Sequence, residues 1–284
     1  MGAVRAGHPA LETLAAPLAE RLQQLRQRIA AFPSVLVAYS GGVDSALVAA
    51  IAAEQLGEQA VAVTGVSPAL APHLRDEAQQ QARWLGIAHR EIATAELNDP
   101  AYASNPAERC YACKRELHSL LAGLKPEDHA AAVLDGVNLD DLGDHRPGIR
   151  AAQERGVISP LAELGIDKAG VRAISRSLGF PWWDKPAQPC LASRFPYGEP
   201  ISASRLQRVA AGEAWLRQRG FRDLRVRSQG ETARLELPRT QLALLLAEPL
   251  RQELVEAFLQ LGFSAVSLDL EGLVSGKLNR DLMP

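Results

Sequence analysis

The fold is decided by the stretch Ser40-Gly41-Gly42-Val43-Asp44-Ser45. It follows an apolar, strand-like run at residues 35–39 and precedes an alanine-rich, helix-like stretch at residues 46–56. A glycine-rich loop in this position suits an anion, because glycines bring bare backbone N–H groups close to a ligand and the helix N-terminus adds its dipole. We therefore predict a phosphate-binding loop; the alternative is a turn that binds nothing, with Asp44 as a helix cap.

The loop is not a Walker A motif, because the Gly-Lys-Ser/Thr ending and its lysine are absent. It resembles instead the PP-loop of the ATP pyrophosphatases, whose pattern is SGGxDS. This resemblance implies that ATP is cut between its α- and β-phosphates, with release of pyrophosphate. It also implies that the loop binds the ATP phosphates through Ser40, Gly41, Gly42, Asp44 and Ser45, with Asp44 also binding Mg²⁺.

The composition is that of a soluble enzyme. The 284 residues allow one large domain or two smaller ones, and 47% hydrophobic residues are enough for a substantial core. A net charge of −2 gives no overall attraction to nucleic acid. We see neither a signal peptide nor a membrane-length apolar run and expect a cytoplasmic protein. In a reducing compartment, three cysteines favour metal binding or catalysis over disulfides.

Strand-like and helix-like segments alternate over the first two-thirds of the chain. The predicted strands are residues 35–39, 60–66, 89–92 and 131–134. The predicted helices are residues 11–31, 46–56, 72–85, 109–124 and 168–178. This order predicts an α/β fold with a mostly parallel sheet covered on both faces, and ligands at the C-terminal ends of its strands.

A proline-rich stretch at residues 180–200 marks the expected domain junction. Beyond it we predict a helix, two strands, a helical region and a last strand, at residues 202–219, 224–228, 233–237, 242–261 and 265–270. That order suggests a small α+β domain. We place a PP-loop ATP pyrophosphatase domain at residues 1–186 and a substrate and sulfur-transfer domain at residues 187–284.

A second polar loop follows the predicted strand at residues 131–134. It contains Gly136, Asn138, Asp140 and Asp141, and continues to His145 and Arg146. The carboxylates suit Mg²⁺ and Arg146 suits a phosphate, so we expect this loop beside the first one. The alternative is a polar surface loop.

The three cysteines are Cys110 and Cys113, in a Cys-x-x-Cys pattern, and Cys190. Residues three apart on a helix face the same way, so two thiolates can share one ion or cluster. The set suits a 4Fe–4S cluster with one open iron, or a zinc ion with one open position. A thioredoxin-like redox pair and buried structural cysteines are the alternatives.

Several motifs together resemble the LarE family of ATP-dependent sulfur transferases in the PP-loop superfamily. The matching stretches are residues 40–45, 109–114, 135–148, 189–194, 225–227, 268–273 and 275–279. The resemblance implies a fold like that of the adenine nucleotide alpha hydrolases, with a smaller α+β C-terminal domain. It also implies adenylation of the carboxylates of pyridinium-3,5-biscarboxylic acid mononucleotide and their conversion to thiocarboxylates, a step in making the nickel-pincer nucleotide cofactor.

Members of the family divide by their source of sulfur. One group has a single cysteine, which Cys190 resembles, and this residue gives up its own sulfur in a single turnover. The other group has three cysteines that hold a 4Fe–4S cluster, whose open iron carries a transferable sulfide. Since Cys110, Cys113 and Cys190 match the second group, we predict the cluster route and keep sacrifice of Cys190 as the alternative.

The resemblance also assigns the remaining site residues. Gly136, Asn138 and Asp140 would complete the nucleotide site, with Lys114 near the α-phosphate. Arg225 and Arg227 share one face of a predicted strand and would bind the substrate phosphate; the alternative is an exposed strand face. We regard Arg194 and Glu213 as further candidates, and find no metal-binding spacing among the histidines.

Other functions also have to be weighed, and the family resemblance implies several partners. A tRNA-thiolating PP-loop enzyme would need a basic surface, for which the chain offers only a local patch at residues 217–227. An amide-forming ligase or a nucleotide-binding module without catalysis would have no use for three such cysteines. The resemblance implies a homo-oligomer, a hexamer in relatives, with a sulfide donor and a downstream nickel-insertion protein as partners. We expect neither nucleic acid nor membrane binding.

Overall fold

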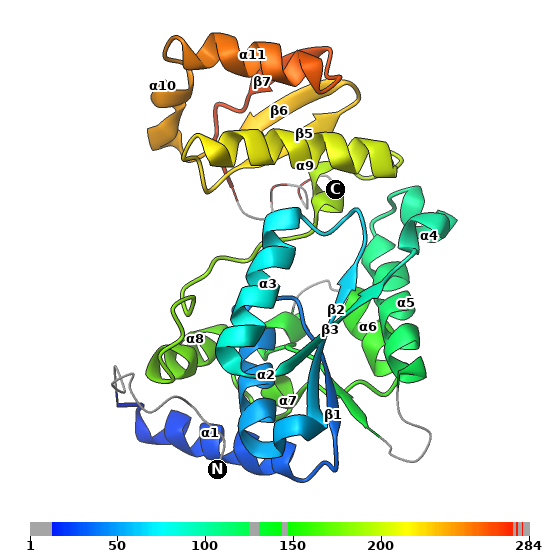
Figure 1. Ribbon diagram of the computed structural model, residues 1–284, viewed down its shortest axis with the longest axis vertical. Helices are drawn as coiled ribbons and strands as arrows, with labels where there is room; N and C mark the ends of the chain where they lie inside the picture. Colours follow the sequence, from blue (N-terminus) through cyan, green and yellow to red (C-terminus); the bar gives the residue numbers. More distant parts are fainter. Residues whose placement is uncertain (1–12, 125–130, 144–146, 275–276, 278–279, 281–284) are drawn as a thin grey trace. The chain divides into compact units, whose positions relative to one another are not determined.

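The computed structural model describes residues 13–124, 131–143 and 147–274, together with Lys277 and Arg280. The chain forms two compact units (Figure 1). The first contains residues 1–67, 72–95 and 110–188; the second contains residues 68–71, 96–109 and 189–284. The second unit thus includes two short segments that lie ahead of the expected boundary at residue 186.

The first unit is built on a four-stranded parallel sheet. Its strands are β1 (Val35–Ala38), β2 (Ala60–Val66), β3 (Ala88–Ala93) and β4 (Ala132–Leu134), in the order β3-β2-β1-β4. The chain moves outward from β1 to β3 and then returns to place β4 on the other side of β1. This reversal puts a topological switch point between the C-terminal ends of β1 and β4, where open α/β sheets bind ligands.

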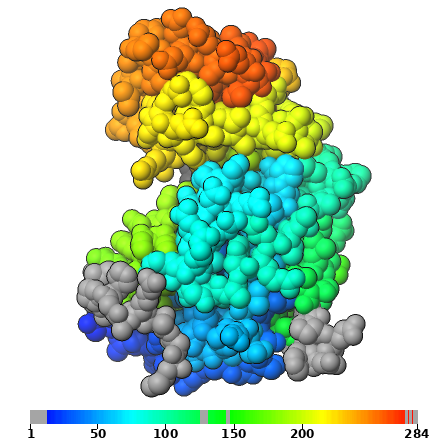
Figure 2. Space-filling model, viewed as in Figure 1, coloured from blue at the N-terminus to red at the C-terminus, as the bar shows by residue number. Residues whose placement is uncertain are grey.

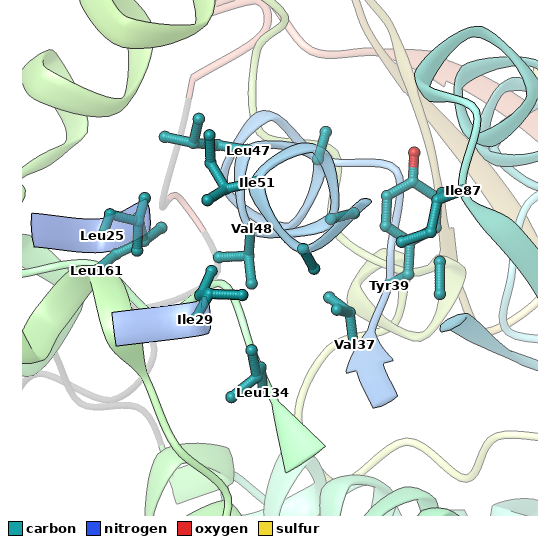
Figure 3. Close-up of a cluster of buried hydrophobic side chains, with 14 of the residues drawn as sticks. Leu25, Ile29, Val37, Tyr39, Leu47, Val48, Ile51, Ile87, Leu134 and Leu161 are labelled. Carbon is teal, nitrogen blue, oxygen red and sulfur yellow. The ribbon is translucent and has the colours of Figure 1, made fainter. Parts of the chain in front are cut away.

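Helices cover both faces of this sheet. They are α1 (Ala16–Ala30), α2 (Val43–Leu56), α3 (Pro72–Leu85), α5 (Arg109–Gly123), α6 (Pro147–Gln153), α7 (Pro160–Glu163) and α8 (Lys168–Ser177). Alternation along β1 directs Val37 into a core with α1, α2 and α8, and Leu36 into a second core with α5 and α6. Helix α2 is buried around Leu47, Val48 and Ile51 (Figure 3). Its N-terminus is therefore held firmly at the end of β1.

The second unit has a three-stranded sheet in the order β5-β6-β7, with β5 and β6 antiparallel and β6 and β7 parallel. Its elements are α4 (Pro100–Ala103), α9 (Ala203–Gln218), β5 (Arg225–Gln229), β6 (Thr232–Glu236), α10 (Leu242–Leu245), α11 (Leu250–Gln260) and β7 (Ala265–Leu268). In Figure 2, much of the visible surface of this unit is yellow and orange. These are the colours of the part of the chain that contains α9, α10 and α11.

Single 3-10 turns connect several elements. They are η1 (Gly57–Gln59), η2 (Glu96–Asn98), η3 (Asp140–Gly143), η4 (Leu191–Arg194) and η5 (Arg239–Gln241). Within the described ranges, no helix is long and apolar enough to cross a membrane.

The predicted α/β class and parallel sheet are confirmed. The helical region expected at residues 242–261 consists of two helices, α10 and α11, separated at residues 246–249. Pro249 is the N-cap of α11. Proline has no backbone N–H to donate, and it disfavours the helical conformation of the residue before it. The leucine-rich pattern hid this break.

Candidate nucleotide and sulfur site

The glycine-rich loop between β1 and α2 is shaped by Gly41. This residue has a φ of 67°, and a Cβ atom built on it would lie 3.0 Å from the Cβ atom of Ala78 on α3. Only glycine meets both requirements without strain. Inside the loop, the hydroxyls of Ser40 and Ser45 lie 3.1 Å apart, and Ser45 Oγ also lies 3.1 Å from the carbonyl oxygen of Gly42.

The N-terminus of α2 has no side-chain cap among the described residues. The N-cap is Gly42, which makes no side-chain capping bond, so Asp44 is not the cap that the alternative interpretation supposed. The first N–H groups of an α-helix have no partner within the helix, and here no side chain covers them as a cap. Together with the positive end of the helix dipole they form a site for an anion.

The second polar loop lies against the first, as expected. A Cβ atom on Gly136 would be 2.6 Å from the backbone nitrogen of Ser45, so the two loops are in backbone contact at the switch point. Asn138 is buried, and its Nδ2 donates to Asp44 Oδ1 at 3.1 Å. The structure therefore brings Gly136 and Asn138 directly to the start of α2.

The acidic residues of the second loop mainly hold its shape. The Oδ2 atom of Asp140 accepts from the backbone N–H of Lys168 at 3.0 Å, and Asp141 is buried and accepts from the backbone N–H of Asn138 at 3.1 Å. Burial raises the pKa of Asp135, although its hydrogen bonds to Ser159 and to the backbone oppose this shift. His145 and Arg146 lie outside the described residues.

Two lysines that the sequence interpretation missed also lie at the PP-loop. Lys168, the first residue of α8, places its Nζ atom 2.5 Å from Asp44 Oδ2. Lys185 donates from Nζ to the carbonyl oxygen of Gly41 at 3.1 Å and forms an ion pair with Glu77 at 2.6 Å. Neither lysine belongs to a pattern that marks it. The sequence signal that points to lysines from elsewhere in the chain is the absence of a lysine from the loop itself.

Helix α5 carries Cys110, Cys113 and Lys114 in its first turns. Cys110 and Lys114 are exposed, and Cys113 is half-buried. The start of α6 packs here, since a Cβ atom on Gly148 would lie 2.9 Å from Cγ of Lys114. Two thiols one helical turn apart at an accessible position are suited to share a ligand.

Cys190 belongs to the second unit, where it is exposed and forms the N-cap of η4. Its carbonyl oxygen accepts from Ser193 Oγ at 2.8 Å. The guanidinium of Arg194 donates to the carbonyl oxygens of Pro189 and Cys190 at 2.9 and 3.3 Å. Across the described residues, no three His, Cys, Asp or Glu side chains form a group that could hold a metal ion.

Arg194 and Glu213 form a buried ion pair in the second unit. Two nitrogens of Arg194 donate to the two carboxylate oxygens at 2.8 and 3.1 Å, and both side chains are at most 3% exposed. Burial tends to raise the pKa of Glu213, but Arg194, Arg217 and the backbone N–H of Val226 outweigh it and lower the pKa. This pair fixes the loop that carries Cys190.

The two arginines of β5 have different surroundings. Arg227 is buried, pairs with Glu236 at 2.8 Å and donates to the carbonyl oxygen of Ser193 at 2.6 Å. Half-buried Arg225 donates only to the backbone oxygen of Leu224 among the described residues and has no carboxylate partner there. Burial, followed by repulsion from Arg194, lowers its pKa to about 10.

A pocket of about 300 Å³ opens beside Arg227. Five cationic residues line it: Arg194, Arg227, Arg234, Lys277 and Arg280. Two acidic residues, Asp269 and Glu271, also contribute to its wall. Cationic side chains outnumber carboxylates in the lining, but each of the five already forms an ion pair with a carboxylate, so an anionic group would have to bind beside these pairs.

Comparison with known proteins places the chain in a family. Residues 18–102, which span β1, the PP-loop, α2 and β3, match the family model for asparagine synthase. Pyridinium-3,5-bisthiocarboxylic acid mononucleotide synthase of Lactiplantibacillus plantarum is 36% identical over 87% of this chain and 90% of its own length. An uncharacterised protein of Synechocystis is 54% identical over 93% of this chain and 99% of its own. The chain belongs to the LarE family of PP-loop, ATP-dependent sulfurtransferases.

Proposed function

We propose that this enzyme converts the two carboxylates of pyridinium-3,5-biscarboxylic acid mononucleotide to thiocarboxylates. The observation that carries the proposal is the PP-loop at the β1/β4 switch point, where Asp44, Asn138 and the N-terminus of α2 converge. The 36% identical relative is a pyridinium-3,5-bisthiocarboxylic acid mononucleotide synthase, and this activity supports the choice of substrate.

The chemistry follows from the poor leaving-group ability of a carboxylate oxygen. One carboxylate oxygen attacks the α-phosphorus of ATP, and the bond to the β-phosphate oxygen breaks to release pyrophosphate. A sulfur nucleophile then attacks the activated carbonyl carbon, and AMP leaves with the original carboxylate oxygen. A second ATP serves the second carboxylate. Mg²⁺ would be held by Asp44 and by ATP phosphates, and Lys114 would face the α-phosphate.

We assign Cys110, Cys113 and Cys190 as the ligands of a 4Fe–4S cluster. The donor set fits, because three thiols leave one iron open and two of them share a turn of α5. When bound, the cluster would supply a transferable sulfide. The alternative source is the sulfur of Cys190 itself, whose loop Arg194 holds through the carbonyl oxygens of Pro189 and Cys190.

The two sulfur sources can be separated by analysis of anaerobically purified protein. The cluster route predicts about four irons per chain with acid-labile sulfide, both lost in Cys113→Ser. An iron-free protein after anaerobic reconstitution would overturn that assignment. Mass spectrometry after one turnover would then show whether Cys190 has lost its sulfur and become dehydroalanine.

The basic pocket of the second unit would receive the substrate phosphate. Arg225 lies on the same strand as the pocket residue Arg227 and supports this role, because among the described residues its half-buried guanidinium has no carboxylate partner, which is costly unless an anion binds it. Arg227 and Arg194 stand beside it on β5 and η4. Phosphate-dependent thermal stabilisation that disappears in Arg225→Met would support this role; unchanged stabilisation would contradict it.

The tRNA-thiolating alternative is less well supported. Its basic patch is largely neutralised, because Arg217, Arg219 and Arg227 pair with Glu213, Glu253 and Glu236. Titration with tRNA tests it, since a true partner would bind with a steep dependence on salt.

For the assembled enzyme we propose a cytoplasmic homo-oligomer, a hexamer as in relatives. It would pass its product to a downstream nickel-insertion protein and would be reloaded by a sulfide donor.

A further inference from the structure

The PP-loop lacks the positive charge that its ligand requires. Residues 40–45 contain one charged side chain, and that side chain is the carboxylate of Asp44. A triphosphate brings several negative charges beside it, while the hydroxyls and backbone N–H groups of the loop carry only partial charges. Apart from Mg²⁺, the compensating cations must therefore come from other parts of the chain.

We propose that Lys168 and Lys185 supply these cations and bind the β- and γ-phosphates of ATP. The inference rests on the proposed use of ATP at this loop. Lys168 reaches the loop from α8 and Lys185 from the proline-rich stretch that follows it. The two ammonium groups contact two residues of the same loop, Asp44 and Gly41.

The position of Lys168 favours a phosphate over a purely structural ion pair. As the first residue of α8, it places a cation at the positive end of a helix dipole, which is unfavourable for the helix itself. It also faces the first turn of α2, the positive end of a second helix. A phosphate beside Asp44 would interact favourably with the ammonium group of Lys168 and with the positive ends of both helices.

Lys185 has a complementary environment. Its side chain is 11% exposed, whereas that of its partner Glu77 is 41% exposed, so the cation lies inward and the carboxylate lies outward. Its second contact is the carbonyl oxygen of Gly41, which leaves an ammonium proton for a further acceptor. A phosphate in the loop could therefore bind Lys185 while Glu77 remains near the surface.

Calorimetric titration of the full-length protein with ATP, pyrophosphate and AMP tests the proposal. Lys168→Gln and Lys185→Gln should each weaken ATP and pyrophosphate binding about 10- to 100-fold, as expected for a lost charge-assisted hydrogen bond. AMP affinity should change less than about threefold, because AMP lacks the β- and γ-phosphates. Lys168→Arg and Lys185→Arg should restore part of the loss.

Arg28→Gln is the matched control, since it removes one positive charge from an exposed pair with Glu163 in the same unit. It should leave all three affinities unchanged. Equal weakening of ATP and AMP in the lysine variants would mean that the lysines only shape the loop, and unchanged ATP binding would mean no role; either result overturns the proposal. A wild-type protein that binds no ATP would instead contradict the proposed function. Thermal unfolding of each variant identifies any that fail to fold.

Discussion

At the scale of single residues, the second unit depends on charges buried in pairs. Glu213 is 1% exposed and receives hydrogen bonds from Arg194, Arg217 and the backbone N–H of Val226. Removal of one partner from such a group leaves the others buried and uncompensated. The consequence is a strong and pH-dependent contribution to stability.

Glu213→Gln should lower the free energy of unfolding by about 3–5 kcal/mol at neutral pH. The pKa of Glu213 is lowered in the fold, so its contribution is full above the pKa of an unfolded glutamate and is lost as the pH falls through the folded value. The difference between variant and wild type in urea unfolding should thus shrink in acid. Glu253→Gln, from an exposed pair with Arg219, should cost less than about 1 kcal/mol. Equal effects would contradict this account.

Arg225 and Arg227 should respond in opposite directions to replacement by methionine. Arg225→Met removes a half-buried charge that has no carboxylate partner among the described residues, and should raise the free energy of unfolding by about 1 kcal/mol. Arg227→Met leaves fully buried Glu236 with Arg234 alone and should lower it by about 2–4 kcal/mol. Chemical unfolding measures both changes; destabilisation by Arg225→Met would argue against its assignment as an anion-binding residue.

At the scale of elements, the nucleotide site depends on contact between a loop and a helix. The loop after β4 lies against the first turn of α2, and the closest approach is between backbones at Gly136. Backbone atoms cannot turn away as a side chain can. A single added methyl group at this point should therefore displace the start of α2.

Gly136→Ala should reduce ATP affinity at least about tenfold and destabilise the protein by about 1–3 kcal/mol, because its Cβ atom would lie 2.6 Å from the nitrogen of Ser45. Gly143→Ala is the control from the same loop, where none of the described residues lies within 4 Å of an added Cβ atom. Calorimetry and thermal unfolding should separate the two variants clearly. Similar results for both would mean that the loop contact does not define the site.

The local elements could be read from the sequence because their signals are local. The strand, glycine loop and helix around Asp44 follow directly in the chain, and β2 and α3 have the predicted bounds. The approach of Lys168 and Lys185 depends on tertiary packing, which no spacing revealed. Nor does the symmetric Arg-Val-Arg pattern show that, within the described part of the chain, Arg227 has a carboxylate partner and Arg225 has none. The roles assigned to the site residues, and the domain boundary, remain predictions.

At the scale of the whole molecule, the proposed chemistry is divided between the two units. The groups assigned to ATP belong to the first unit, together with Cys110 and Cys113, whereas Cys190 and the basic pocket belong to the second. Sites in separate units should respond independently to substitution. Catalysis, in contrast, should require both.

Cys190→Ser provides a test of this division. ATP affinity should stay within about twofold of wild type, because none of the groups assigned to ATP lies in the second unit. Thiocarboxylate formation should fall below detection, since the sulfur route needs Cys190 in either version. Calorimetry and product analysis on the same preparation measure both quantities. Sulfur transfer that survives the substitution would contradict the proposed use of Cys190.

The most direct test of the central claim is mass spectrometry of the product. Anaerobically purified enzyme would be incubated with Mg²⁺, ATP and pyridinium-3,5-biscarboxylic acid mononucleotide. We predict that a carboxylate oxygen is replaced by sulfur, with one AMP and one pyrophosphate released for each sulfur inserted. Consumption of ATP without sulfur in the product, or an amide in its place, would contradict the account.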